Sequence, residues 1–82
     1  MSYEKVLQAG KFVIGTKQAV KALQEGIVQK LIIAADADPK ITADAVKQAS
    51  EREVPIIYAD SMKKLGKACN IQVGAATVAI IH

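Results

Sequence analysis

The sequence has little of what most catalytic and metal-binding sites are built from. Its 82 residues include a single cysteine, Cys69, and a single histidine, His82, which is the last residue. This scarcity argues against a disulfide framework, a zinc site and a catalytic triad that uses histidine. We expect Cys69 to be a small buried apolar residue, and its isolation is typical of a protein in a reducing compartment.

Aromatic residues and long apolar runs are also scarce. Tryptophan is absent, and Phe and Tyr together make up 4% of a chain that is 51% hydrophobic, so the core must be aliphatic. The longest apolar run covers residues 75–81, contains Thr77 and is too short to cross a bilayer. No segment resembles a signal peptide, and we expect a cytoplasmic protein that does not contact membranes.

Length and charge narrow the function further. The chain is long enough for one domain of modest size and contains no repeat or low-complexity segment. Eleven Lys or Arg against eight Asp or Glu give a net charge of +3, which suits an anionic partner without the density of a basic tail.

Helical and strand patterns alternate along the chain. We expect helices over residues 3–9, 16–25, 39–53 and 61–68, and strands over residues 12–14, 31–35, 56–58 and 77–81. The continuous apolar run at 31–35 is typical of a central strand that is covered on both faces. This alternation predicts an α/β fold in which a sheet of about four strands lies between helices.

Capping residues and apolar stripes support these helices. Thr16, Asp38 and Ser61 are expected N-caps, Pro39 suits the first helical position, and Gly26 suits the residue after a helix end. The residues expected to face inward are Val6 and Leu7 in the first helix and, in the third, Ile41, Ala45, Val46 and Ala49.

The second expected helix begins with a candidate anion-binding surface. At about 100° per residue, Lys17, Gln18 and Lys21 share one face, whereas the opposite face holds Ala19, Val20, Leu23 and Ile27. The free N–H groups of a helix start add to the two ammonium groups, which suits a phosphate backbone, and the Gln18 amide can read a base edge. The simpler alternative is a solvated amphipathic helix.

Two other polar groups invite a functional reading. Asp36 and Asp38 follow a buried strand, as do the paired carboxylates that hold Mg²⁺ in some phosphoryl-transfer enzymes, but a turn residue and a helix cap explain them more simply. Lys63, Lys64 and Lys67 are expected on an exposed helix face, where they gain importance only if they border another contact surface.

The segment between the fourth helix and the last strand is a second candidate surface, and it consists of Ile71, Gln72, Val73, Gly74 and Ala75. Branched aliphatic residues in such a loop are either core residues or an apolar cover for a ligand. Gly74 would let the backbone approach that ligand closely, so we expect a side chain there to obstruct it.

These fragments together resemble the kink-turn RNA-binding family of ribosomal proteins, the L7Ae and L30e superfamily, and particularly its small bacterial YbxF-type members. The resemblance rests on Gly15-x-x-Gln18-x-x-Lys21 and on Leu65-Gly66-Lys67-Ala68 followed by the 71–75 loop. It extends over nearly the whole chain through Glu25-Gly26, Asp36-Ala37-Asp38-Pro39, Val54-Pro55 and Ser61.

The resemblance implies a three-layer αβα sandwich with a mixed sheet that binds an RNA bend built on tandem sheared G·A pairs. It implies that Gly15 and Thr16 lie against the RNA backbone, Lys17 near phosphates, and Gln18 and Lys21 on guanine edges. It also implies that the loop covers an extruded base with Ile71, Val73 and the neighbouring backbone of Gln72, Gly74 and Ala75.

We therefore expect a non-catalytic, monomeric RNA-binding protein without cofactor, metal or small-molecule substrate, whose target could be ribosomal RNA, a riboswitch or a leader transcript. One alternative is a protein-interaction module that uses the strand edges or the third helix. A magnesium-dependent enzyme acting through Asp36 and Asp38 is the least favoured alternative.

Overall fold

The computed structural model describes residue 7 and residues 10–82. Along these residues the elements are β1 (Lys11–Ile14), α2 (Thr16–Glu25), β2 (Val28–Ala34), α3 (Pro39–Glu51), β3 (Ile56–Ala59), α4 (Met62–Ala68) and β4 (Thr77–Ile81). The helix expected over residues 3–9 lies outside the described residues except for Leu7, which is helical and buried. Among the described residues, no helix is both long enough and apolar enough to cross a membrane.

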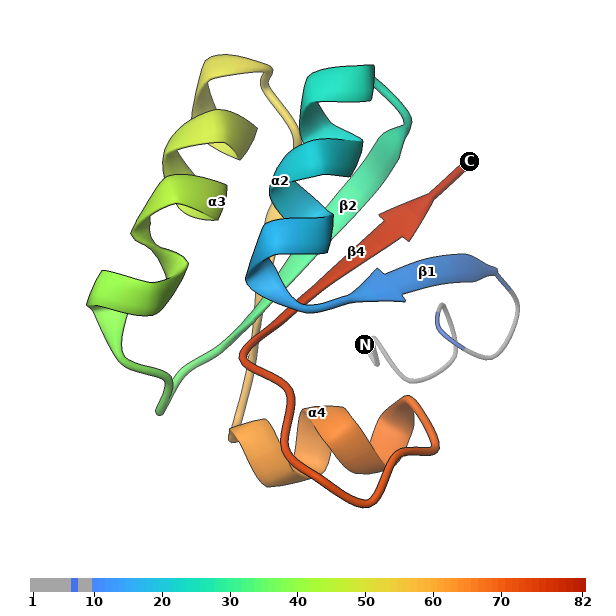
Figure 1. The fold of residues 1–82 in the computed structure, drawn as a ribbon, viewed down its shortest axis with the longest axis vertical. Helices are drawn as coiled ribbons and strands as arrows, with labels where there is room; N and C mark the ends of the chain where they lie inside the picture. The colour runs from blue at the N-terminus through green and yellow to red at the C-terminus, as the bar shows by residue number, and fades with distance from the viewer. Residues whose placement is uncertain (1–6, 8–9) are drawn as a thin grey trace.

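The strands form one mixed sheet in the order β1-β4-β2-β3 (Figure 1). β2 pairs with β3 in parallel and with β4 antiparallel, and β4 pairs antiparallel with β1 on its other side. The interior position of β2 confirms the central strand that its continuous apolar run predicts. It also begins three residues earlier than expected, because Val28 and Lys30 pair with the end of β4 across a register shift.

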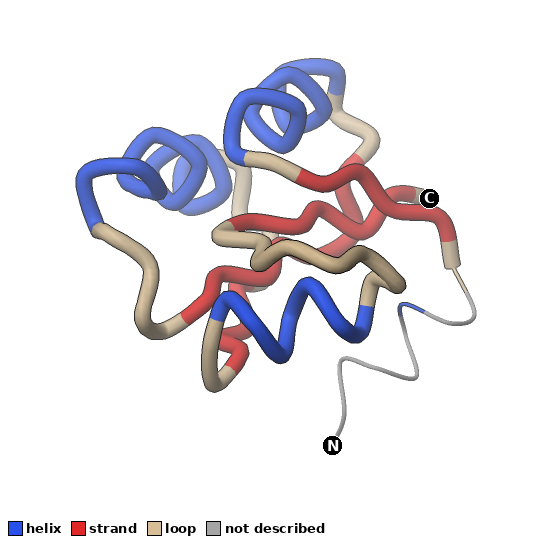
Figure 2. Tube along the Cα trace, turned by 60° about the horizontal axis from the view of Figure 1, so that its bottom comes forward, coloured by secondary structure: helices blue, strands red, loops and turns tan. Residues whose placement is uncertain are grey.

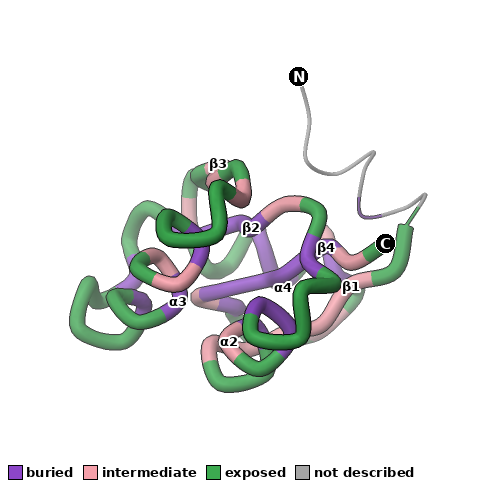
Figure 3. The backbone as a smooth tube through the Cα atoms, turned by 90° about the horizontal axis from the view of Figure 1, so that it is seen from above, coloured by how far each residue is buried: buried purple, intermediate pink, exposed green. Residues whose placement is uncertain are grey.

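Helices cover both faces of this sheet, which confirms the three-layer αβα sandwich. α2 and α3 pack on one face and α4 on the other, as Figure 2 shows. Successive residues of β2 point to opposite sides, so Leu31 and Ile33 join the α2 and α3 layer whereas Ile32 and Ala34 join the α4 layer. Buried backbone accordingly runs through the centre of the molecule (Figure 3).

All three described helices α2, α3 and α4 end in the same way. In each, a residue with positive φ follows the helix, namely Gly26 (74°), Glu53 (56°) and Asn70 (63°). The next N–H then donates to a carbonyl five residues back, as from Ile71 to Gly66 at 3.0 Å. Gly26 was predicted for this role. Asn70 is a residue type that favours this conformation and could have been predicted, whereas Glu53 carries no such signal in the sequence.

The third helix differs from expectation in two details. It ends at Glu51 rather than near Glu53. Ile41 was predicted to face inward, but this is wrong, because 56% of its surface is exposed and Thr42 is buried in its place. The inner stripe follows Thr42, Ala45 and Ala49, so Ile41 lies about 100° around the helix from the first of these residues.

Candidate nucleic-acid interface

The start of α2 is held by the sheet rather than by a capping side chain. Gly15 is the N-cap residue, with φ 107° and ψ 145°, and no side chain caps the helix. Its N–H donates to the carbonyl oxygen of Thr77 in β4 at 2.8 Å. A Cβ at Gly15 would meet nothing within 4 Å, so the glycine is needed for its backbone conformation and not for space.

The prediction that Thr16 caps this helix is wrong. Thr16 is the first helical residue, and its Oγ1 hydrogen-bonds to Oγ1 of Thr77 at 2.9 Å, with either hydroxyl able to donate. Because Gly15 occupies the N-cap position, the Thr16 side chain is directed at β4 instead. The Thr16 hydroxyl is thus already engaged within the protein at the start of the helix.

The polar face of α2 is arranged as its periodicity predicts. Lys17, Gln18 and Lys21 are exposed, whereas Ala19 and Leu23 on the opposite side are completely buried. The first turn contains no acidic residue, so no side chain there neutralises Lys17 or the positive end of the helix dipole. Ile27 departs from the prediction, since it lies beyond the helix end at Gly26 and is 37% exposed.

The loop at residues 71–75 contains both structural and exposed residues. Ile71 is half-buried and packs against the α4 side of the core, and Ala75 is buried. Between them Gln72, Val73 and Gly74 are exposed, and 71% of the Val73 surface faces solvent. The loop therefore divides: its ends belong to the core, and its tip presents a branched aliphatic side chain that the core does not use.

The loop runs back along α4 and lies directly on it. The Ala75 N–H donates to the Met62 carbonyl at 3.0 Å, while the Met62 N–H donates to Oδ1 of Asp36 at 2.7 Å. At the other end of the helix, a Cβ on Gly66 would overlap the Val73 carbonyl oxygen. The loop backbone can approach α4 this closely only because residue 66 has no side chain.

Gly74 has a different role from the one expected. A Cβ there would lie 3.0 Å from Cβ of Met62 and 3.2 Å from its carbonyl carbon, so it would point at α4. The expectation that a side chain at Gly74 obstructs a ligand directly is therefore wrong. A larger residue would act by pushing the loop away from the helix.

The two candidate elements meet at the first residue of β4. Thr77 follows the loop by two positions, and it bonds to Gly15 through its carbonyl and to Thr16 through its hydroxyl. Figure 1 shows the loop leading from α4 to the start of β4, beside the beginning of α2. From the sequence, Thr77 is expected only as a strand residue, since nothing there connects it to a partner 61 positions away.

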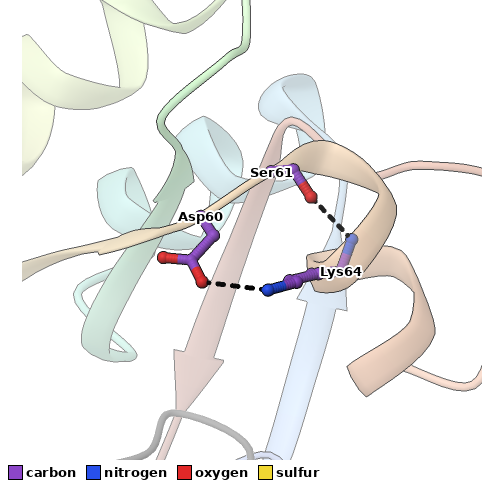
Figure 4. A network of polar contacts seen from close by, with 3 residues as sticks. All are labelled: Asp60, Ser61 and Lys64. Atoms are coloured by element: carbon purple, nitrogen blue, oxygen red, sulfur yellow. Dashed lines mark hydrogen bonds and ion pairs between the residues drawn. The ribbon is translucent and has the colours of Figure 1, made fainter.

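The lysines of α4 border the loop. Lys63, Lys64 and Lys67 are all exposed, and Lys64 pairs with Asp60 at 3.3 Å (Figure 4). Ser61 caps the helix as predicted, accepting from the Lys64 N–H at 3.1 Å. Because both members of the ion pair are largely exposed, the pair adds at most about 1 kcal/mol to stability.

The aspartates considered for a metal site have structural partners instead. Asp38 accepts from the Lys40 N–H at 2.9 Å as the cap of α3, and Asp36 binds the start of α4. Within the described part of the chain, no cluster of three or more His, Cys, Asp or Glu residues could hold a metal ion. Cys69 is buried as predicted, and burial raises the pKa of its thiol.

A shallow apolar groove lies at the other edge of the sheet, between α3 and the end of β3. Its lining includes Pro39, Val46 and the exposed ring of Tyr58. None of the site residues predicted from the sequence lines this groove.

Fold and surface together define an αβα sandwich protein in which an exposed cationic helix start lies beside an exposed apolar loop tip. The chain belongs to the Ribosomal protein L7Ae/L30e/S12e/Gadd45 family, whose family model matches residues 2–82. The resemblance drawn from the sequence is thereby confirmed.

Relatives cover the whole chain. It is 64% identical over its full length to the full length of an RNA-binding protein of Geobacillus sp. (strain WCH70), and 62% identical, again over both full lengths, to RNA-binding protein YbxF of Geobacillus stearothermophilus. A solved structure, the Giardia lamblia 15.5kD RNA binding protein, superposes with a TM-score of 0.85 at 29% identity, covering 96% of this chain and 67% of that one. The family and these names indicate a non-enzymatic protein, as the sequence predicted.

The contact between Gly66 and the loop yields a stability prediction. Gly66→Ala should lower the free energy of unfolding by about 1–3 kcal/mol, because the new methyl group must displace the Val73 carbonyl. Lys67→Ala on the same helix touches an exposed position and should change stability by less than about 0.5 kcal/mol. Thermal and urea unfolding of both variants measure the difference, and equal stability would show that the loop does not rest on α4.

Proposed function

We propose that this protein binds RNA and recognises a kink-turn, a bend made by tandem sheared G·A pairs beside a bulge. The observation that supports this most strongly is the position of Thr77. This buried residue bonds to the start of α2 and follows the 71–75 loop by two positions, so it connects the two exposed surfaces. A straight duplex would meet only one of these surfaces along its length. A bent RNA that exposes both base edges and an extruded base matches the pair.

In the proposed complex, α2 reads the RNA from its first two turns. The backbone at Gly15 and Thr16 lies against the RNA backbone, and Lys17 lies near phosphates. Gln18 and Lys21, one turn apart on the exposed face, contact guanine edges, where lysine can donate to O6 or N7.

The loop covers the extruded base in this proposal. Val73 supplies the apolar surface, since its side chain is free of the core, and the backbone of Gln72 and Gly74 approaches the RNA beside it. Ile71 and Ala75 act indirectly: they hold the ends of the loop in the core so that its tip has a fixed position.

The protein would act as a monomer in the cytoplasm and would select one conformation of its RNA. RNA of this kind exchanges between bent and extended forms, and a protein that binds only the bent form shifts the population toward it.

The groove beside Tyr58 is where the alternative, a protein-interaction module, would bind its partner, so substitutions there and in α2 separate the two functions.

The first test compares two RNAs. A duplex interrupted by a three-nucleotide bulge and followed by tandem G·A pairs should bind far more tightly than the same duplex with Watson–Crick pairs at those positions. Isothermal titration calorimetry at one fixed salt concentration measures both affinities, because general charge attraction depends strongly on salt. Equal affinities would contradict kink-turn recognition and leave only attraction between lysines and phosphates.

A second prediction separates the lysines of α2. Lys21→Ala should weaken binding of the kinked RNA by about 1–3 kcal/mol and hardly affect plain duplex, because it removes a base-edge contact. Lys17→Ala is the matched control, with the same charge change on the same helix face, and should weaken binding to both RNAs. Titrations that show an equal loss on both RNAs for Lys21→Ala would assign Lys21 to a phosphate.

The third prediction concerns the loop tip. Val73→Ser should leave the melting temperature nearly unchanged, because the side chain is exposed, and should weaken binding to kinked RNA by about 1–2 kcal/mol through lost apolar contact. Ile71→Ser removes a similar side chain from the core and should lower the melting temperature by several degrees. A Val73→Ser protein that binds kinked RNA as tightly as the parent would remove the loop tip from the site.

A further inference from the structure

Two side-chain hydroxyl groups, those of Thr16 and Thr77, connect the elements of the proposed site. Thr77 has no exposed surface, and its Oγ1 lies 2.9 Å from Oγ1 of Thr16. The pairing of β1 with β4 ends at Ile14 and Val78. The next backbone bond, from Gly15 to Thr77, is therefore the last one between these segments before α2 begins.

We propose that the Thr16 and Thr77 hydroxyl pair is a positioning device that sets the orientation of the α2 reading face relative to the 71–75 loop, and thereby the preference for bent RNA. This inference rests on the proposed function, and it assigns a specificity role to two residues that would not themselves touch a base.

The backbone bonds at Gly15 leave a role for the Thr16 side chain. The bond from Gly15 to Thr77 fixes the end of β1, and the Gly15 carbonyl accepts from the Ala19 N–H at 2.9 Å as the first bond of the helix. Gly15 has no side chain of its own to cap the helix, so these two backbone bonds leave the side chains of the first turn without a contact to the sheet. Thr16 is the first residue of that turn, and its hydroxyl bond fixes the turn from one side. Gln18 and Lys21 follow on the same helix, so a change in the orientation of the first turn moves both.

The position of Thr77 connects this orientation to the loop. Ala75, two residues earlier, donates to Met62 and so ties the loop to α4. Only Ala76 separates Ala75 from Thr77, so one short segment connects the start of α2 with the loop. A ligand that must meet both surfaces at once benefits from this connection, because less conformational freedom is lost on binding.

A side chain of the same shape cannot replace either threonine without loss. Valine resembles threonine in outline, but a single Thr→Val change leaves the partner hydroxyl in a mostly buried place without a hydrogen bond. Replacing both threonines by valine removes both hydroxyls and restores apolar contact, so no hydroxyl is left without a partner. The effect of the pair on stability can then be separated from its effect on the orientation of α2.

The experiment measures stability and RNA discrimination for Thr16→Val, Thr77→Val, the double valine variant and Thr77→Ser. Discrimination is the ratio of the dissociation constants of the Watson–Crick duplex and the kinked RNA described above. Both single valine variants should lower this ratio about fivefold, the value of one ordinary hydrogen bond, and Thr77→Val should do so without changing the affinity for the Watson–Crick duplex. The double variant should regain the melting temperature but not the ratio, and Thr77→Ser should retain the ratio because its hydroxyl remains.

Ile80→Val provides a matched control on the same strand. Ile80 is buried near the far end of β4, so this variant should lose some stability without changing the ratio. A double valine variant that regains both stability and the ratio would show that the pair is structural only, and so would single variants with the parental ratio.

Amide hydrogen exchange of the free proteins distinguishes failure of this inference from failure of the proposed function. The valine variants should exchange faster than the parent at residues 19–21, whose amides donate within the helix, and equally at residues 45–49 of α3. If the parent does not discriminate between the RNAs, the proposed function fails whatever the exchange shows. If it discriminates and exchange at residues 19–21 is unchanged in the variants, the positioning role of the pair is wrong.

Discussion

The interior position of β4, between β1 and β2, determines where both candidate binding elements lie. β1 leads through Gly15 directly into α2, and the 71–75 loop leads into β4. Because β1 and β4 are antiparallel neighbours, the end of one and the start of the other lie at the same edge of the sheet. Two segments far apart in sequence therefore become adjacent as a consequence of strand pairing, before any side chain of the surface is considered.

The two elements differ in how they would act on RNA. The lysines of α2 and α4 are exposed, so their main general effect is a positive field that attracts any phosphate backbone. Such attraction carries no sequence information. In the proposed complex, discrimination comes from groups with direction or shape, namely the Gln18 amide, the Lys21 ammonium and the Val73 side chain. These groups discriminate only when their spacing is fixed, and the close contact of the loop with Gly66 and Met62 fixes one half of it.

Local patterns allowed most of the fold to be predicted. Apolar periodicity located α2 at Thr16–Glu25, where the structure has it, and placed Lys17, Gln18 and Lys21 on its exposed face. Errors arose where tertiary contacts decided the outcome. Thr16 has a good capping residue type but is engaged by Thr77, and the direction in which Gly74 would point a side chain depends on α4. Periodicity could not decide whether Val73 belonged to the core or the surface, because the answer depends on how the chain packs after Ile71.

The measurement that tests the account most directly is the shape of the RNA itself. Fluorescence resonance energy transfer between dyes at the two ends of the bulged duplex with tandem G·A pairs reports bending during titration. The account predicts that transfer rises and saturates at one protein per RNA, and that the Watson–Crick counterpart shows no rise at the same protein concentrations. Tight binding to the bulged RNA without any change in transfer would contradict the central claim that the protein selects a bent form.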